Sequence, residues 1–207
     1  MTRLGMAIDL RTCIACHACT VACKVNNNLP AGTIYNRVQT EGGAYLDTAA
    51  GTYPNDIQRV KRPVSCQHCS NPACVNVCPT GASHVLENGI VAIDTDACIG
   101  CKSCIQACPY DVRVVYDEEP AYFVDHALGD WDAPAHVVKT ADKCGFCASR
   151  LERGEVPACM DLCPGGARYW GDLDDPESEI SKFLAENTWE RYLEEAGTEP
   201  NCYYVVA

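Results

Sequence analysis

A run of four closely spaced cysteines near the middle of the sequence most restricts what this chain can fold into. The run consists of Cys98, Cys101, Cys104 and Cys108, and Pro109 follows it directly. Three thiolates at C-x-x-C-x-x-C spacing can bind three corners of a cubane iron–sulfur cluster, and a fourth before proline binds a neighbouring cluster. Gly100 lets the backbone approach such a cluster closely. The run therefore predicts an iron–sulfur site.

Three further runs repeat this pattern with altered spacing. They are Cys13, Cys16, Cys19 and Cys23; Cys66, Cys69, Cys74 and Cys78; and Cys144, Cys147, Cys159 and Cys163. Proline follows the fourth cysteine of each run except the first, where Lys24 takes its place. Ala15 and Gly145 are expected to act as Gly100 does. The runs use sixteen of the 17 cysteines, and the last one, Cys202, is expected to be a small buried apolar residue.

The abundance of cysteine, 17 in 207 residues, indicates either a disulfide scaffold or a metal-rich protein. The count is odd, and the opening MTRLGMAIDL lacks the apolar segment of a secretory signal. Three-residue spacings also suit ligands that converge on one centre. Metal binding is favoured. A structural multi-zinc module is the alternative, although zinc sites prefer two separate C-x-x-C pairs.

Charge and motif content narrow the function further. The formal net charge of −12 disfavours nucleic-acid binding, which needs basic patches. The sequence contains no run of 18 apolar residues, so we expect no membrane span. No phosphate-binding glycine loop or nucleophile elbow is present, and we expect no catalytic residues. The chain is predicted to be no enzyme by itself.

The position of the fourth cysteine predicts how the runs share clusters. Because that cysteine serves the partner cluster where two clusters lie together, the second run pairs with the third and the first with the fourth. The expected ligand sets are set A (Cys13, Cys16, Cys19 and Cys163), set B (Cys144, Cys147, Cys159 and Cys23), set C (Cys66, Cys69, Cys74 and Cys108) and set D (Cys98, Cys101, Cys104 and Cys78). The alternative is that each run holds its own cluster.

Three other residues near the ligands are singled out. Lys24 directly follows a ligand that links both chain ends, so its charge is a candidate for tuning a cluster potential. His17 and His68 lie inside ligand runs, but sixteen cysteines already fill four cubanes. A hydrogen-bonding or surface role is therefore expected for both histidines.

Short elements are expected between the runs. The predicted strands are 4–10, 57–61, 167–171 and 203–206, and a hairpin over 83–94 turns at Asn88-Gly89. A helix is predicted to start at Asp175-Pro176-Glu177 and to run to residue 187, and a second one over 188–196 is predicted to stop at Gly197. The fold class is α+β with little regular secondary structure and a core organised by clusters.

Residues 64–117 resemble a bacterial two-cluster ferredoxin, because CP-TGA, a hairpin and D-x-D-x-C follow one another. The four-run order, from LGMAIDLRTCIACHACTVACK to CMDLCPGGARYWGDLDDP, resembles the iron–sulfur subunit of the dimethyl sulfoxide reductase family. Lys24 in place of proline agrees with that family. The implied organisation is tandem ferredoxin-like: an outer unit (1–30 plus 140–175), an excursion (31–63), an inner unit (64–117), a second excursion (118–139) and a C-terminal tail (176–207).

The resemblance implies an electron-transfer subunit with four [4Fe-4S] clusters that serves a molybdenum or tungsten bis-pterin catalytic subunit. Subunits of arsenate, thiosulfate or polysulfide reductases and of catechol dehydroxylases look most similar. A membrane quinol-oxidising anchor is a further partner found in the family. The alternative is a polyferredoxin-like subunit of a hydrogenase or formate-linked complex. Without a signal of its own, the chain is expected in the cytoplasm, or outside it when co-exported with a twin-arginine partner.

Overall fold

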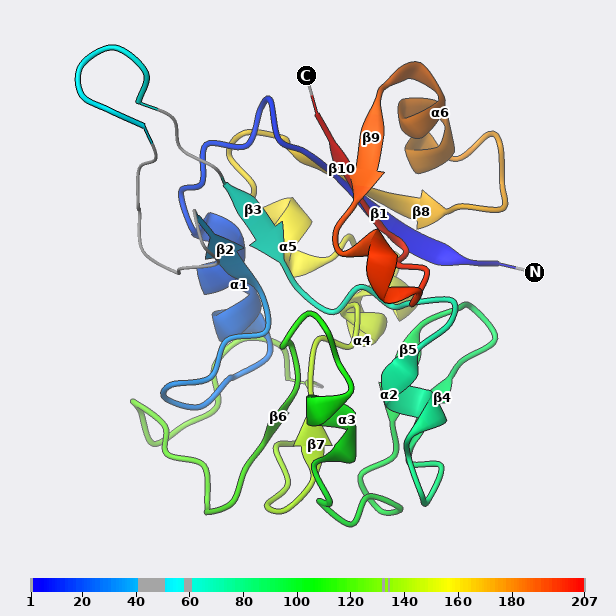
Figure 1. Ribbon diagram of the computed structural model, residues 1–207. Coiled ribbons are helices and arrows are strands. Elements are labelled where there is room, and N and C mark those ends of the chain that lie inside the picture. The colour runs from blue at the N-terminus through cyan, green and yellow to red at the C-terminus, as the bar shows by residue number, and fades with distance from the viewer. Residues whose placement is uncertain (1, 41–50, 58–60, 132, 134, 207) are drawn as a thin grey trace.

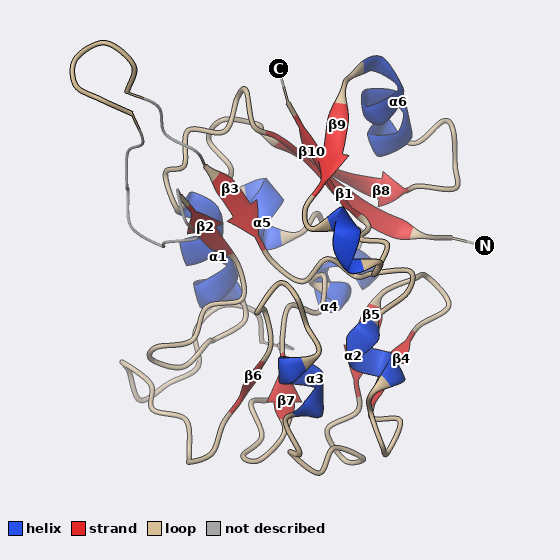
Figure 2. Ribbon diagram, in the orientation of Figure 1, coloured by secondary structure: helices blue, strands red, loops and turns tan. Residues whose placement is uncertain are grey.

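The computed structural model describes residues 2–40, 51–57, 61–131, 133 and 135–206. Short elements joined by long loops make up the described part of the chain, as Figures 1 and 2 show. The strands are β1 (Leu4–Asp9), β2 (Arg37–Gln39), β3 (Arg62–Val64), β4 (Ser83–Val85), β5 (Val91–Ile93), β6 (Val114–Val115), β7 (Ala141–Asp142), β8 (Arg168–Asp172), β9 (Trp189–Arg191) and β10 (Cys202–Val205). The helices are α1 (Ala18–Asn26), α2 (Ala73–Asn76), α3 (Ser103–Gln106), α4 (Ala148–Glu152), α5 (Ala158–Asp161) and α6 (Glu179–Glu186), with a 3₁₀ turn, η2 (Glu194–Ala196). Small sheets and short helices with little regular structure agree with the predicted class.

The largest sheet joins segments that lie far apart in the sequence. Its strand order is β8-β1-β10-β9, and β1 runs parallel to β10 and antiparallel to β8. In Figure 1 the blue β1 therefore lies beside the red β10. The strands predicted at 4–10, 167–171 and 203–206 are confirmed here, within a residue or two of their predicted bounds.

The helix predicted over 188–196 is largely wrong. Trp189–Arg191 instead form β9, which pairs antiparallel with Tyr203–Val205 of β10. Only Glu194–Ala196 coil, as one 3₁₀ turn that ends at Gly197 in the left-handed region with φ +67°. The free edge of β10 outweighs the local helix propensity of this segment.

The two faces of the sheet bury different partners because side chains alternate along a strand. Ala7 and Tyr203 point toward α6, where Ile180 is fully buried against them. Met6 and Tyr204 lie in the core on the other face, which contains cysteine side chains. The sheet thus separates an apolar helical layer from the cysteine-rich interior.

Helix α6 starts later than its sequence predicts. Ser178 is the N-cap, and its hydroxyl accepts a hydrogen bond from the Ser181 amide at 3.2 Å. The Asp175 carboxylate instead accepts from the Glu177 amide at 2.9 Å, within a turn that precedes the helix. Asp175 therefore caps a turn, and the predicted start at 175–177 is wrong by a few residues.

The residue after each fourth cysteine decides how far the preceding helix runs. Helices α2, α3 and α5 have four residues each and end two residues before a Cys-Pro pair, since proline cannot continue a helix. Helix α1 continues past Cys23 to Asn26, because Lys24 stands where proline would end it. The Lys24 Nζ donates to the carbonyls of Leu29, Pro30 and Thr33 at 3.3, 2.8 and 3.0 Å.

Within the described residues, three two-stranded ladders tie the loops together. The β4–β5 hairpin turns at Asn88-Gly89 as predicted, and the Gly89 amide donates to the Leu86 carbonyl at 2.9 Å. The strand predicted at 57–61 falls partly on residues 58–60, outside the described part, and the observed β3 begins at Arg62 and pairs with β2. The β6–β7 ladder joins the two ends of the loop that covers 118–139. None of the described helices is long and apolar enough to cross a membrane.

Candidate metal centres

The residue before the second cysteine of each run has a left-handed backbone. Its φ angles are +54° at Ala15, +44° at His68, +65° at Gly100 and +60° at Phe146. This shared bend curls each loop around the space beside its cysteines. Gly100 alone requires glycine there, because an added Cβ would lie 2.3 Å from the Lys139 carbonyl oxygen. The expectation that Gly145 takes this part is wrong, since Phe146 occupies the bent position.

Four cysteines from the two ends of the chain line one cavity. They are Cys13, Cys16, Cys19 and Cys163, the members of set A. Helix α1 carries Cys19 and packs on α5, which directly precedes Cys163. The β1–β8 pairing holds the first and last runs together, because β1 leads into the first run and β8 follows the last. The structure thereby brings residues from opposite ends of the chain to one site.

Two further cavities are each lined by three cysteines of one run and the fourth of another. The second contains Cys23, Cys144, Cys147 and Cys159, with Cys66 and Cys202 also in its wall. The third contains Cys66, Cys69, Cys74 and Cys108. Each of the three cavities is lined by four cysteines of one expected set, and this common ligand type fits one kind of group in each.

The four cysteines of set D line none of these three cavities, and their exposure ranges from the buried Cys104 to the exposed Cys101. Helices α2 and α3 pack on each other and precede Cys78 and Cys108, respectively. Cys101 is exposed, and Cys78 of the second run interacts with it electrostatically. Within the described ranges, no group of three or more His, Cys, Asp or Glu side chains is spaced to hold a single metal ion.

Backbone amides point at the ligand sulfurs. Such bonds run from Ser83 to Cys78, Ala141 to Cys98, Phe146 to Cys144 and Ala167 to Cys163, with nitrogen–sulfur distances of 3.4, 3.3, 3.4 and 3.4 Å. Hydrogen bonds to sulfur are among the means by which proteins set cluster potentials. The donor pattern fits thiolates that hold an anionic cluster.

Two buried guanidinium groups also contact sulfur. Arg168 lies 3.7 Å from the Cys159 sulfur and 3.2 Å from the Asn36 Oδ1. Arg113 donates to the Cys74 sulfur at 3.0 Å and to the Ser83 hydroxyl at 2.9 Å. Burial by itself would lower the pKa of each arginine, but the neighbouring thiolates outweigh it and raise the pKa. Both side chains are therefore permanent internal cations.

Comparison with known proteins identifies the family. The 4Fe-4S dicluster domain matches residues 57–123 and 132–173, and a 4Fe-4S binding domain matches 11–26. A Halobacterium salinarum protein, named as a dimethyl sulfoxide reductase iron–sulfur subunit, is 44% identical over 99% of this chain and 79% of its own length. The chain is an iron–sulfur subunit of the dimethyl sulfoxide reductase family.

Other relatives of this iron–sulfur subunit span nearly the whole chain as well. A selenate reductase subunit of Mesobacillus selenatarsenatis is 40% identical over 97% of the chain and 70% of its own length. A tetrathionate reductase subunit of Salmonella typhimurium is 40% identical over 98% of the chain and 72% of its own length. The chain thus has [4Fe-4S] clusters and an electron-transfer function, as the sequence predicts.

Burial sets the acidity of the cysteines in this iron–sulfur subunit. It raises the pKa of Cys147 to about 11 and that of Cys69 to about 12, so thiolates there need a compensating positive centre. Cys66 differs: burial would raise its pKa, but His68 and Lys143 lower it to about 5. Iron supplies that compensation at a ligand thiolate, which couples cluster binding to folding.

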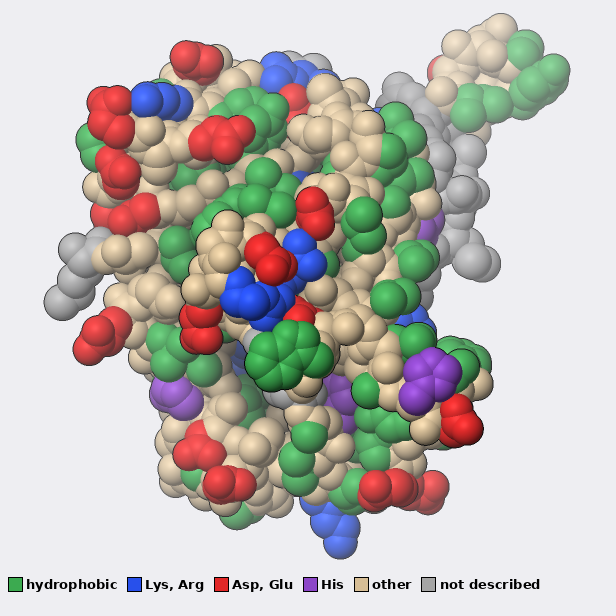
Figure 3. Space-filling view, turned by 180° about the vertical axis from the view of Figure 1, so that it is seen from behind, with side chains coloured by type: hydrophobic (Ala, Val, Ile, Leu, Met, Phe, Trp, Pro, Cys, Tyr) green, Lys and Arg blue, Asp and Glu red, His purple; other side chains and the backbone are tan. Residues whose placement is uncertain are grey.

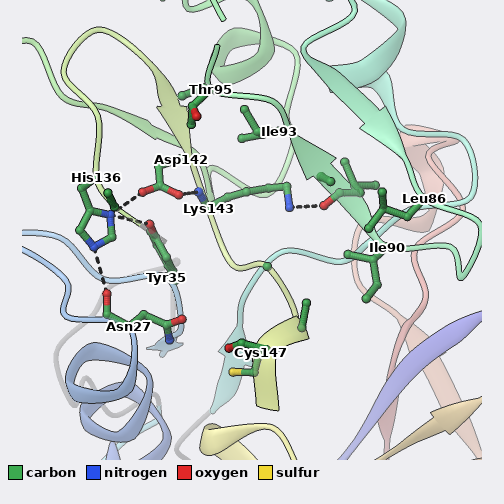
Figure 4. Close-up of a pocket in the computed structure, with 17 residues that line it drawn as sticks. Asn27, Tyr35, Leu86, Ile90, Ile93, Thr95, His136, Asp142, Lys143 and Cys147 are labelled. Carbon is green, nitrogen blue, oxygen red and sulfur yellow. Dashed lines mark hydrogen bonds and ion pairs between the residues drawn. The ribbon is translucent and has the colours of Figure 1, made fainter. Parts of the chain in front are cut away.

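Figure 4 shows a further pocket, which is lined both by His136 of the 118–139 loop and by Cys147 of the fourth cysteine run. His136 lies 2.7 Å from the Asp142 carboxylate through Nδ1, and its Nε2 lies 3.0 Å from the Asn27 carbonyl. Burial would lower the pKa of His136, but Asp142 outweighs it and raises the pKa. Lys143 reaches toward the hairpin and donates to the carbonyls of Val91 and, at 2.8 Å, Cys144.

Sequence reasoning missed Arg168, which carries no local signal, because its contact with Cys159 depends on how β8 and α5 pack. His68, predicted as a hydrogen-bonding or surface residue, is buried, with 1% of its surface exposed, and its Nδ1 accepts a hydrogen bond from the Val91 amide at 3.2 Å. The tuning role predicted for Lys24 stays a prediction; its Nζ bonds to backbone carbonyls, and its charge lies over the Phe123 ring at 5.7 Å.

Proposed function

We propose that this chain holds four [4Fe-4S] clusters and relays single electrons through them to or from a molybdenum or tungsten bis-pterin catalytic subunit. The proposed ligand sets are set A (Cys13, Cys16, Cys19 and Cys163), set B (Cys144, Cys147, Cys159 and Cys23), set C (Cys66, Cys69, Cys74 and Cys108) and set D (Cys98, Cys101, Cys104 and Cys78). The observation that carries this proposal is the composition of the three cavities, each of which combines three cysteines of one run with the last of its partner run.

Neighbouring ligand sets support an order A–B–C–D for the relay. Cys159 of set B interacts with Cys19 and Cys163 of set A. Cys66 of set C lies in the wall of the set B cavity and interacts with Cys144. Arg113 interacts with Cys66 and Cys74 of set C and with Cys104 of set D. Each step of the relay thus joins adjacent sites.

The protein supplies fixed ligands and dipoles, and the clusters supply one-electron redox chemistry. Amide N–H groups and buried cations around the sulfurs are already oriented, so they need little rearrangement when charge changes. Asn27 acts in this way at set B, because its side-chain amide donates to the Cys23 sulfur at 3.6 Å.

The proposed units follow from the same pairing. An outer unit (1–30 plus 140–175) holds sets A and B, and an inner unit (64–117) holds C and D. The packing of α1 on α5 and of α2 on α3 supports one helix pair in each unit. The exposed residues of segments 31–63, 118–139 and 176–207 are the proposed docking elements for partners; within the last segment β10 is excluded, because it is buried in the sheet between β1 and β9.

Both ends of the relay reach the surface. Ile14, next to Cys13 of set A, is 60% exposed, and Ile99, next to Cys98 of set D, is 65% exposed. An apolar side chain beside a redox centre suits contact with another protein. One end would serve the catalytic subunit, and the other an external donor or acceptor such as a membrane quinol-oxidising anchor. Figure 3 shows that on one face acidic side chains are spread widely, which disfavours nucleic acid as a partner.

The metal content of the anaerobically purified native complex tests this function. About sixteen iron and sixteen sulfide per copy of this chain, with molybdenum or tungsten in a co-purifying large subunit, is the expected result. Zinc without sulfide would establish the zinc module instead. Full iron with nickel would assign the chain to a hydrogenase-type complex.

Paired substitutions test the ligand sets. Cys13→Ala with Cys163→Ala removes two ligands of one proposed cluster, and Cys144→Ala with Cys163→Ala removes one ligand from each of two. The first pair should lose about four iron and the second about eight. If each run held its own cluster, these two results would be reversed. Cys202→Ser is the matched control and should retain all the iron, because Cys202 belongs to no proposed set.

A further inference from the structure

His68 occupies a position that the other three runs give to residues without a polar side chain. The corresponding residues are Ala15, Gly100 and Phe146, and all four share the left-handed backbone. The loop around His68 is held in place by Asn201, whose side-chain amide donates to the His68 carbonyl at 2.7 Å. The backbone amide of Asn201 also donates to the Gln67 carbonyl at 2.9 Å. The loop that carries the imidazole is therefore fixed by the residue that precedes β10.

A hydrogen bond from the Val91 amide assigns the proton on this imidazole. The amide donates to Nδ1 at 3.2 Å, so Nδ1 is an acceptor and the ring proton is on Nε2. The Nε2 atom is buried and has no hydrogen-bond partner among the atoms that the structure describes. A buried N–H without a partner is destabilising, so such a group calls for an acceptor.

The surroundings of the ring indicate what that acceptor is. The Phe146 ring packs edge-on against the His68 ring, with centroids 5.2 Å apart and planes at 84°. Phe146 has no nitrogen, oxygen or sulfur atom in its side chain that could accept the Nε2 proton. The Cys66 thiolate is the anionic group with the strongest interaction with the imidazole. Cys66 is a ligand of the proposed set C, so a cluster held there presents sulfur atoms to this region.

We propose that His68 is a hydrogen-bond donor to the cluster of set C, and that its Nε2–H, which has no partner among the described atoms of the chain, donates to an inorganic sulfide of that cluster and raises its potential. This inference rests on the proposed function. A hydrogen bond to sulfur stabilises the reduced, more negative cluster more than the oxidised one. Since Ala15, Gly100 and Phe146 have no side-chain donor, set C is the one set that receives a donor from this position.

Two substitutions at His68 distinguish the role of Nδ1 from that of Nε2. In His68→Asn the side-chain oxygen can still accept from the Val91 amide, but nothing replaces Nε2. In His68→Gln the longer side chain places an N–H donor near the Nε2 position. Redox titration of the complex, followed by electron paramagnetic resonance, should show one of four midpoint potentials lowered in His68→Asn and restored toward the native value in His68→Gln. The exposed His126 is the matched control, and His126→Asn should change no midpoint.

A second measurement uses the native sequence and does not depend on how the variants fold. Histidine labelled with ¹⁵N only in the ring is incorporated, and pulsed electron paramagnetic resonance measures nitrogen coupling to the reduced clusters. A ring-nitrogen coupling that persists in His17→Asn supports the inference. Four unchanged midpoints in His68→Asn with full iron, or no ring-nitrogen coupling in the native protein, would overturn it. Failure of the proposed function is distinct, because the native protein itself would then lack four clusters.

Discussion

Removal of the buried charge at Arg168 should shift the potentials of two clusters. Its guanidinium lies between proposed sets A and B, since it interacts with Cys159 and with Cys19. Methionine at this position would keep much of the side-chain volume and remove the cation. A reduced cluster carries one more negative charge than an oxidised one, so loss of the cation disfavours reduction and lowers the potential.

The distance to sulfur gives the size of the effect. One unit charge 3.7 Å from the Cys159 sulfur contributes about 4.5 kcal/mol at an effective dielectric constant of about 20. The added electron is shared over the cluster, at larger distances from the cation, which reduces this to about 2 kcal/mol. At about 59 mV per tenfold change in a one-electron equilibrium, the expected decrease is roughly 85 mV.

Potentiometric titration of the purified complex measures this decrease directly. Two midpoints should fall in Arg168→Met, while the clusters of sets C and D keep theirs. Arg168→Lys retains the charge and loses the fork that bonds the Asn36 side chain, so its midpoints should stay closer to the native values. Equal midpoints in the methionine and lysine variants, both with full iron, would refute the electrostatic reasoning.

Two further predictions address packing and pH. Gly100→Ala should lower the free energy of unfolding by about 1 kcal/mol or more and remove about four iron atoms per chain, because the added Cβ would lie 2.3 Å from the Lys139 carbonyl oxygen. Iron analysis of the purified variant measures this loss. Gly154→Ala is the control, because its added Cβ meets nothing within 4 Å. Asp142 raises the pKa of His136, so the pair stabilises the fold below the ordinary histidine pKa of about 6.5, and the benefit is lost as pH rises through the raised value. The gap in Tm between native and His136→Gln protein should therefore be larger at about pH 6 than at about pH 8.5, and an equal gap would contradict the charged pair.

Local spacing predicts the parts of this fold that depend on neighbouring residues. The hairpin at Asn88-Gly89 and the end of each short helix before Cys-Pro need only a few residues to specify them. Segment 189–191 shows where such reasoning fails. Its helix propensity is local, but β10 lies further along the chain and offers an unpaired edge that only the folded chain reveals.

For the site as well, the sequence predicts the residues that local spacing specifies and misses those whose contacts come from distant segments. The cysteine runs are visible in sequence because cluster ligands need short fixed spacing. Arg168 is not visible, because its contacts with Cys159 and Asn36 depend on how separate segments pack. His68 is visible as a residue inside a run, but the Val91 bond that fixes its tautomer comes from the next hairpin.

The position of its charges indicates how this subunit controls electron transfer. The chain is acidic, with a net charge of −12, but exposed charges are screened by salt over a Debye length of about 8 Å. Arg168, Arg113 and Lys143 are each at most 5% exposed, so salt screens them far less. Arg168 lies between sets A and B, Lys143 between B and C, and Arg113 between C and D. We therefore expect these three cations and the proposed His68 donor to contribute to the differences in potential between neighbouring proposed clusters, and increasing ionic strength should alter partner docking before it alters the cluster potentials.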